Sequence, residues 1–560
     1  MAMYRDHQTE RVAMLSFKPG NPSLGPSRLI GYLEGKTVVP CTRCRHCGFG
    51  EWETTLEPGK EYPVIIEERQ RRLETGTIKS YVAHAYVPRQ ASAFWQQIYS
   101  NTETIELGTT GIEIVFLGGM AEAGSRTSAL VIYNNQALLV DCGINVASLS
   151  RSQILEPHEM DLEDLESLSR VNELPEFEIM THLMDVRGLQ LVGILITHSH
   201  LDHYGGLVAL KAILGDLMPP IYGTQFTRSM ISHYVNDRDF RYPRLEPIEP
   251  GIETAIGPFR ILPFGVPHAV MDALGYSIGV EGQESRVVFS GDLKAHYRTP
   301  RDIFAFTETL KGLPPTKALV LDSTNAGVPG LSGLEDEVEQ GMIEILGRAP
   351  GRVIVTFFST RFDRLKMLVE LGALFGKEVG VWGASFKPTL EAARNRGLYL
   401  PNLSENRVFE CDIIAVTGCQ ATDTSVAWRL SQGEQCGGIS LRNDDTFVLS
   451  AVPIPGRITP VRMMLDNLLT TSEGDVWVDH HTRSKPIGCK ETRTHVSGHG
   501  FQEDLRVVFE SIQPEYVIPY HASVASMVDL ADLVTSPATR HSLDPSHVIL
   551  FEENGGRIVL

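Results

Sequence analysis

The chain has 560 residues, of which 42% are hydrophobic and 21% are charged. This length exceeds what a single hydrophobic core supports, so the sequence predicts two or three domains. The composition is that of a globular protein, and no apolar run approaches the ~20 residues that cross a bilayer, so no membrane segment is expected. The formal net charge of -19 argues against tight non-specific binding to nucleic acid, but it leaves room for metal ions or a locally positive channel.

The N-terminus and the cysteines indicate a cellular location. The first residues lack the apolar core and the small-residue cleavage site of a secretory signal. Three of the eight cysteines are clustered and the other five are scattered, a pattern unlike a disulfide framework. A reducing, cytoplasmic location is therefore expected.

Residues 1–110 are predicted to form a small strand-rich module, because short alternating runs such as YPVIIE (62–67) are typical of half-buried strands. Cys41, Cys44 and Cys47 have the two-residue spacing with which thiolates hold a structural zinc ion. Such sites normally have four ligands, and only three are adjacent here, so an unliganded turn and an iron–sulfur or redox site are the alternatives. The module is also the expected contact for a protein partner.

Apolar strands that end at glycine alternate with helical patterns from IEIVFLGG (112–119) onward, which predicts an α/β domain over residues 111–328. A second alternation over residues 329–460 includes the strand RVIVTFFS (352–359) and the amphipathic helix that follows it. It predicts a doubly wound segment inserted into the first domain. Residues 461–560 are expected to return to that first domain.

The segment GILITHSHLDHYGG (193–206) places the pattern HxHxDH directly after a predicted buried strand. Strand ends are where α/β folds present functional side chains. Imidazole nitrogen and carboxylate oxygen are ligands of zinc, or of manganese where oxygen dominates. The pattern predicts one ion at His198 and His200 and a second at Asp202 and His203. A polar turn with solvated histidines is the alternative, but this spacing rarely arises by chance.

On this motif and those that follow it, the chain is identified as a member of the metallo-β-lactamase superfamily. By that resemblance, Asp141 in ALLVDCG orients the histidines that bind the first ion, without binding the ion itself. His268 in GVPHAV is a further ligand, and Asp292 in VVFSGDLK bridges both ions. The resemblance implies two zinc ions, or manganese, with a hydroxide between them that attacks a phosphodiester.

The sequence after Asp292 resembles the β-CASP nucleases of this superfamily, and most of all the ribonuclease J family. The motif ALVLDSTNA carries Asp322, THVSGHG carries His499, and VIPYHAS carries His521. The resemblance implies that His521 completes the second ion site, and that Asp322 and His499 hold and protonate the scissile phosphate and leaving oxygen. A turn cap for Asp322 and a plain loop position for His499 are the alternatives.

Four more residues are candidates for contact with a substrate phosphate. Ser359 and Arg364 lie in FFSTRFDR, which is similar to a phosphate-contacting stretch of the family but one residue longer. Ser497 and Gly498 are expected to offer a hydroxyl and backbone N–H groups to a terminal phosphate. A simple glycine turn is the alternative for the second pair.

The implied fold is a metallo-β-lactamase αββα sandwich with an inserted β-CASP α/β domain and the N-terminal module. The implied activity is metal-dependent 5′-to-3′ exonucleolytic hydrolysis of RNA, with endonuclease activity in addition, and its catalytic residues are Asp202, Asp322 and His499. An Artemis-like DNA nuclease and a catalytically weak binding scaffold are the alternatives, although the intact ligand set argues against the scaffold. Little sequence follows the last motif, so dimerisation through the C-terminal domain of bacterial relatives is not expected.

Overall fold

The structure is a computed structural model of the chain. From residue 104 to 560 it describes all residues except 109, 123, 147–172, 237–243, 300, 455–456, 472, 483–484 and 552. Before residue 104 it describes five strands and residues 94, 98 and 99. Cys41, Cys44 and Cys47 lie outside the described residues, so the zinc module stays a prediction. No helix among the described residues is long and apolar enough to span a bilayer.

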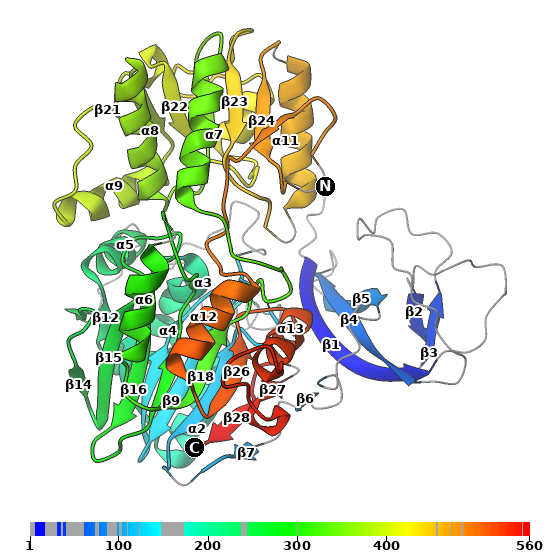
Figure 1. Ribbon diagram of the computed structural model, residues 1–560, viewed down its shortest axis with the longest axis vertical. Coiled ribbons are helices and arrows are strands. Elements are labelled where there is room, and N and C mark those ends of the chain that lie inside the picture. Colours follow the sequence, from blue (N-terminus) through cyan, green and yellow to red (C-terminus); the bar gives the residue numbers. More distant parts are fainter. Residues whose placement is uncertain are drawn as a thin grey trace.

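Two sheets form the centre of the lower unit in Figure 1. The eight-stranded sheet has the order β13 (Leu245–Pro247), β12 (Ile221–Gly223), β11 (Gln190–Leu195), β10 (Gln136–Val140), β9 (Ser128–Tyr133), β8 (Glu113–Gly118), β28 (Arg557–Val559) and β7 (Thr104–Glu106). The six-stranded sheet has the order β14 (Thr254–Ile256), β15 (Phe259–Gly265), β16 (Leu274–Val280), β17 (Arg286–Phe289), β18 (Thr316–Asp322) and β26 (Tyr516–Tyr520).

Helices cover the outer faces of both sheets. The eight-stranded sheet packs against α2 (Phe177–Arg187), α4 (Leu207–Leu214) and α5 (Gln225–Asn236), with the short α3 (Leu201–Tyr204) before α4. The other sheet packs against α6 (Asp302–Lys311), α12 (Gln502–Ile512) and α13 (Val524–Thr535). Side chains alternate along β8, so Ile114 and Phe116 join the core between the sheets while Val115 and Leu117 meet the helices. These four layers confirm the expected αββα sandwich.

The upper unit in Figure 1 is a seven-stranded sheet in which every neighbouring pair is parallel. Its order is β21 (Leu403–Ser404), β20 (Val379–Trp382), β22 (Ile413–Val416), β19 (Val353–Thr356), β23 (Thr446–Leu449), β24 (Val476–Asp479) and β25 (Lys490–Thr492). One face packs against α7 (Glu335–Arg348), α8 (Phe362–Phe375) and α9 (Phe386–Asn395), and the other against α10 (Val426–Ser431) and α11 (Ile458–Thr471). A parallel sheet covered on both faces is what the apolar strand runs predict.

Two expected domain limits differ from the structure. The return to the sandwich was expected at residue 461, but α11, β24 and β25 belong to the inserted unit, so the chain returns only after Thr492. The N-terminal module was expected to extend to residue 110, but β6 (Ile98–Tyr99) pairs with β27 (Leu550–Phe551), and β7 pairs with β28. A strand has the same local pattern in either sheet, so periodicity alone does not assign it.

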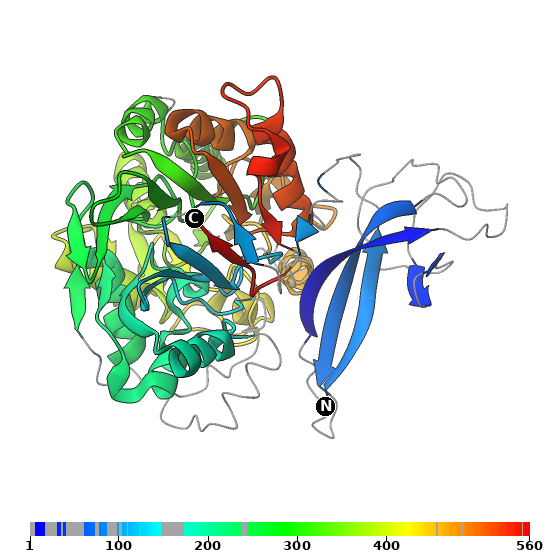
Figure 2. The same cartoon turned by 90° about the horizontal axis from the view of Figure 1, so that it is seen from below.

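The described residues before residue 90 form strands, in agreement with the expected strand-rich module. Strands β1 (Asp6–Ser16), β4 (Glu61–Arg72) and β5 (Ile78–Tyr86) form an antiparallel sheet, and β2 (Gly31–Glu34) pairs with β3 (Thr37–Pro40). Figures 1 and 2 both show this sheet beside the sandwich rather than within it. Short 3-10 turns complete the described elements: η3 (Gly215–Leu217), η4 (Val408–Glu410) and η5 (Pro545–His547).

Candidate metal centre

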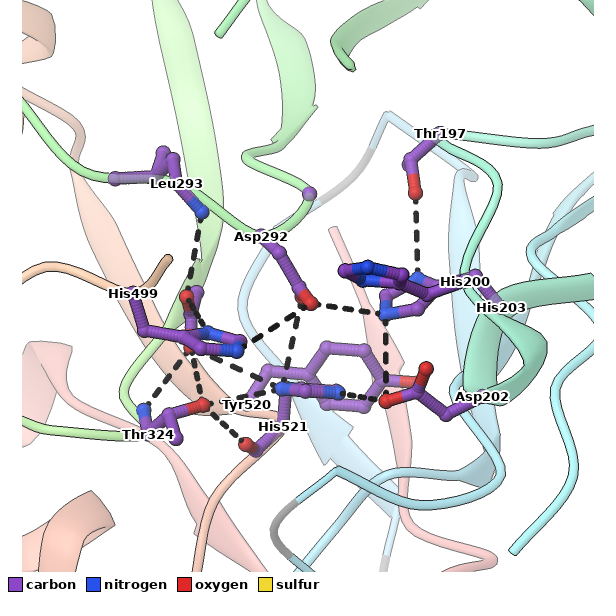
Figure 3. Close-up of polar contacts among 12 residues, drawn as sticks. Thr197, His200, Asp202, His203, Asp292, Leu293, Thr324, His499, Tyr520 and His521 are labelled. Carbon is purple, nitrogen blue, oxygen red and sulfur yellow. Dashed lines mark hydrogen bonds and ion pairs between the residues drawn. The ribbon is translucent and has the colours of Figure 1, made fainter. Parts of the chain in front are cut away.

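The candidate centre lies where several strands end at the same edge of the sandwich. The HxHxDH loop follows β11, and Asp292 follows β17. Asp322 ends β18, and His521 follows β26. Strands β17, β18 and β26 are parallel neighbours, so their carboxyl ends meet, and Figure 3 shows the side chains converging there.

Seven side chains predicted as ligands form two groups that share Asp292. Within each group the ligand atoms lie within 4.8 Å of one another, and the members are His198, His200, His268 and Asp292 in one, and Asp202, His203, Asp292 and His521 in the other. In the first group His200 Nδ1 lies 3.0 Å from His198 Nε2 and 3.3 Å from His268 Nε2. In the second, His203 Nε2 lies 3.1 Å from an Asp292 oxygen. The structure thus brings together every predicted ligand.

In each histidine of the two ligand groups, the ring nitrogen that faces away from the centre lies within hydrogen-bond distance of a polar group. His203 Nδ1 donates to Asp141 and His268 Nδ1 donates to the Gly498 carbonyl, at 2.8 and 2.9 Å. The remaining outer nitrogens lie 3.1 to 3.3 Å from hydroxyl groups: His198 from Thr197, His521 from Thr324, and His200 from Thr360. Such outer partners fix the tautomer and direct the other nitrogen's lone pair inward, as in metal sites.

The electrostatics fit a divalent ion. Burial lowers the pKa of His198 and His268 well below the ordinary value and that of His200 to about 4, so these rings stay neutral, the form that binds metals. Burial alone would raise the pKa of Asp292, but the surrounding imidazoles hold it well below its usual range. Nε2 of His521 is buried without a hydrogen-bond partner and faces Asp202 Oδ2 at 3.4 Å. Facing lone pairs, ionised carboxylates and an orphaned nitrogen form a donor set suited to zinc or manganese.

Asp141 supports the centre differently from the expectation. Its carboxylate accepts directly from His203, a ligand of the second group, and from the backbone N–H and hydroxyl of Thr197. It reaches His198 only through that hydroxyl. The expected support of the first-ion histidines is therefore indirect, and His203 is the residue that Asp141 orients.

His499 and Asp322 form a hydrogen-bonded pair next to Asp292, outside the two ligand groups. His499 Nδ1 donates to Asp322 Oδ2 at 2.8 Å, and Nε2 lies 3.8 Å from an Asp292 oxygen. Burial would lower the pKa of His499, but Asp322 and Asp292 raise it to about 9. The other Asp322 oxygen accepts from the N–H and hydroxyl of Thr324, so Asp322 caps a turn as well. A protonated imidazole beside the bridging carboxylate is suited to proton donation.

The four phosphate candidates have other contacts. Arg364 is buried and pairs with Glu335 at 2.7 Å, so it does not face the centre as expected. Ser497 Oγ accepts from the His499 backbone N–H at 3.0 Å, and Gly498 uses its carbonyl to hold His268. Ser359 is only partly buried, and its neighbour Thr360 is the residue of this stretch that touches the centre. No pattern in the sequence indicates that contact, which joins the inserted unit to His200.

Three family models match consecutive parts of the chain. They are the beta-lactamase superfamily domain over residues 180–326, the ribonuclease J beta-CASP domain over 350–468, and the Zn-dependent metallo-hydrolase RNA specificity domain over 485–543. The matched domains, together with the fold and the ligand set, support a metal-dependent hydrolase, a nuclease built from a metallo-β-lactamase domain and an inserted β-CASP domain.

Individual relatives lead further in the same direction. The chain is 25% identical to ribonuclease J of Mycoplasma genitalium over 75% of its length and 69% of that protein. It is 27% identical to ribonuclease J of Mycobacterium tuberculosis over 80% of its length and 75% of that protein. A crystal structure of a protein of unknown function from Enterococcus faecalis matches with a TM-score of 0.53 at 15% identity, over 80% of this chain and all of the other, which shows a shared fold. The resemblance to ribonuclease J inferred from the motifs is confirmed.

Proposed function

We propose that this chain hydrolyses RNA phosphodiesters with two divalent ions, one in each ligand group. The observation that carries the proposal is the position of Asp292, which belongs to both groups and also lies beside His499. Two ions held in this way would lower the pKa of a water molecule and offset the charge that develops on the phosphate. The histidine-rich first group favours zinc, while the two carboxylates of the second group also suit manganese.

The proposed work of the chain's own residues follows from their contacts. Asp202, His203 and His521 hold the second ion position, where the Asp202 carboxylate stays ionised because His203 and His521 outweigh its burial and lower its pKa. His499 donates a proton to the leaving oxygen from Nε2, because Asp322 occupies Nδ1. The raised pKa of His499 keeps that proton in place at neutral pH.

RNA is favoured over DNA by two comparisons. The RNA specificity domain model covers residues 485–543, the segment that contains His499 and His521. The two relatives described above carry the name ribonuclease J. We therefore extend the proposal to a 5′-to-3′ exonuclease that also cleaves internally, as first expected from the motifs.

The direct test uses the metal-free protein reconstituted with zinc or manganese. RNA and DNA of the same sequence, labelled at the 3′ end and carrying either a 5′-monophosphate or a 5′-hydroxyl, are offered separately. We expect RNA cleavage, with the labelled strand shortened stepwise from its 5′ end. Preferential DNA cleavage would instead support the Artemis-like alternative, and no cleavage of either polymer with both ions bound would support the binding scaffold.

A further inference from the structure

Asp504 is a buried carboxylate that stands outside the ligand set. It is the third residue of α12, and its side chain is fully shielded from solvent. Oδ2 accepts from the Phe501 backbone N–H at 3.0 Å, the ordinary way in which an acidic residue caps the first turn of a helix. A cap of this kind is normally at the surface, and complete burial indicates a further role.

The same carboxylate also accepts from two other segments. Oδ2 accepts from the Ser332 N–H at 2.7 Å, and Oδ1 accepts from the Ala295 N–H at 2.9 Å, with His296 Nε2 3.5 Å from Oδ1. Ala295 follows the bridging Asp292 by three residues, and Phe501 follows His499 by two. Ser332 lies on the segment between Asp322 and α7. One carboxylate thus accepts hydrogen bonds from three loops: those that carry Asp292 and His499, and the one that follows Asp322.

Direct contacts between these loops make the arrangement stiff. The Gly500 N–H donates to the Leu293 carbonyl at 2.7 Å, and the Leu293 N–H donates to Asp322 Oδ2 at 3.3 Å. A Cβ at Gly500 would lie 2.7 Å from Asp504 Cβ, so the glycine permits this close approach. Hydrogen bonds from backbone amides to a buried carboxylate are charge-assisted and strong, and they hold the loops at a fixed separation.

We propose that Asp504 is a positioning residue that sets the spacing between the bridging Asp292 and the proton donor His499. The inference rests on the proposed function for the roles of those two groups. Nε2 of His499 lies 3.8 Å from Asp292 Oδ2, and the loop contacts hold that separation together with the hydrogen bond from His499 to Asp322. A misplacement of about 1 Å in such an arrangement costs on the order of 100-fold in rate.

The test variant is Asp504→Asn. An amide keeps the shape of the carboxylate but has only one acceptor oxygen, so it can hold Ser332 and Phe501 or Ala295, while its NH₂ group meets the remaining donor. The matched control is Asp445→Asn. Asp445 is equally buried and holds Arg352 and the Arg442 N–H, but it precedes β23 and touches none of the three loops.

Three quantities are measured for both variants: the thermal midpoint of the metal-free protein, zinc retention against a competing chelator, and the separate kcat and KM values for a short RNA. Both variants should lose stability. Only Asp504→Asn should lose kcat by about 10- to 100-fold with KM within about threefold, and it should also bind zinc about 10-fold more weakly. If Asp504→Asn does not fold, Asp504→Glu, which keeps both acceptors, replaces it with the same expectations.

If Asp504→Asn and Asp445→Asn have equal kcat values and equal zinc affinities, Asp504 has only a structural role and the proposal is overturned. The zinc measurement keeps this failure separate from failure of the proposed function. If the wild-type protein cleaves no RNA, the proposed function is wrong, whereas a selective loss of zinc affinity in Asp504→Asn would still show that this carboxylate positions the Asp292 loop.

Discussion

Removal of the Asp322 carboxylate should move the pH dependence of turnover. Asp322 Oδ2 lies 2.8 Å from His499 Nδ1 and is the leading influence that raises the pKa of the imidazole, against the burial that lowers it. The pKa rises from the ordinary histidine value of 6.5 to about 9, which corresponds to about 3 kcal/mol of preference for the imidazolium form. In Asp322→Asn burial dominates, and the pKa should fall toward or below 6.5.

The sign of the effect follows from the role of His499 as a proton donor. A donor with a raised pKa is protonated below that pKa and loses its proton as the pH rises through it. The alkaline limb of the kcat profile should therefore move at least one pH unit lower in Asp322→Asn, with Asp445→Asn as the remote control. If the alkaline limb of the kcat profile lies at the same pH in Asp322→Asn and Asp445→Asn, then His499 is not a proton donor whose pKa Asp322 raises.

Three further predictions concern other substitutions. His499→Ala should lower kcat about 100- to 10,000-fold with unchanged metal content, because the ring acts on the leaving group. If elemental analysis shows that this variant loses one metal equivalent, His499 is a metal ligand instead. Arg364→Ala should lower the free energy of unfolding by about 3 to 5 kcal/mol in denaturant titrations, because it leaves the buried Glu335 with one partner fewer. The control Lys366→Ala, on the exposed side of α8, should change the free energy of unfolding little. Serine at Cys41, Cys44 and Cys47 together should remove one equivalent of zinc and leave cleavage of a short unstructured RNA intact, and unchanged zinc content would argue against the structural ion.

The HxHxDH ligands could be predicted from their position after an apolar strand, and the remaining ligands from the resemblance to a known family. HxHxDH, Asp292 and His521 stand immediately after runs such as GILIT and VVFS, and the ends of parallel strands must meet at one edge. For HxHxDH the local pattern therefore indicated both the ligand chemistry and the position in the fold. The roles of His268, Asp292 and His521 as ligands were assigned through the family resemblance.

Contacts between distant segments could not be predicted in this way. Arg364 lies four residues after Thr360 and has the charge for a phosphate, but the buried face of α8 directs it to Glu335, a residue from another helix. The outer partners of His268 and His200, the Gly498 carbonyl and Thr360, likewise depend on how loops from two units pack. Periodicity also could not assign β24 to the inserted sheet, because a buried parallel strand has the same pattern in either unit.

The central claim is that two ions share Asp292, and metal content measured together with turnover tests it most directly. Elemental analysis of the reconstituted wild-type protein should give two equivalents at the centre, after any zinc bound by the N-terminal cysteines is subtracted using the triple serine variant. Asp292→Ala should retain fewer than two, keep its far-UV circular dichroism, and lose more than about 100-fold in kcat, because the shared carboxylate positions both ions. A fully active wild-type centre with one equivalent, or an Asp292→Ala protein within about tenfold of wild-type turnover, which is a barrier change of only about 1.4 kcal/mol, would contradict the account.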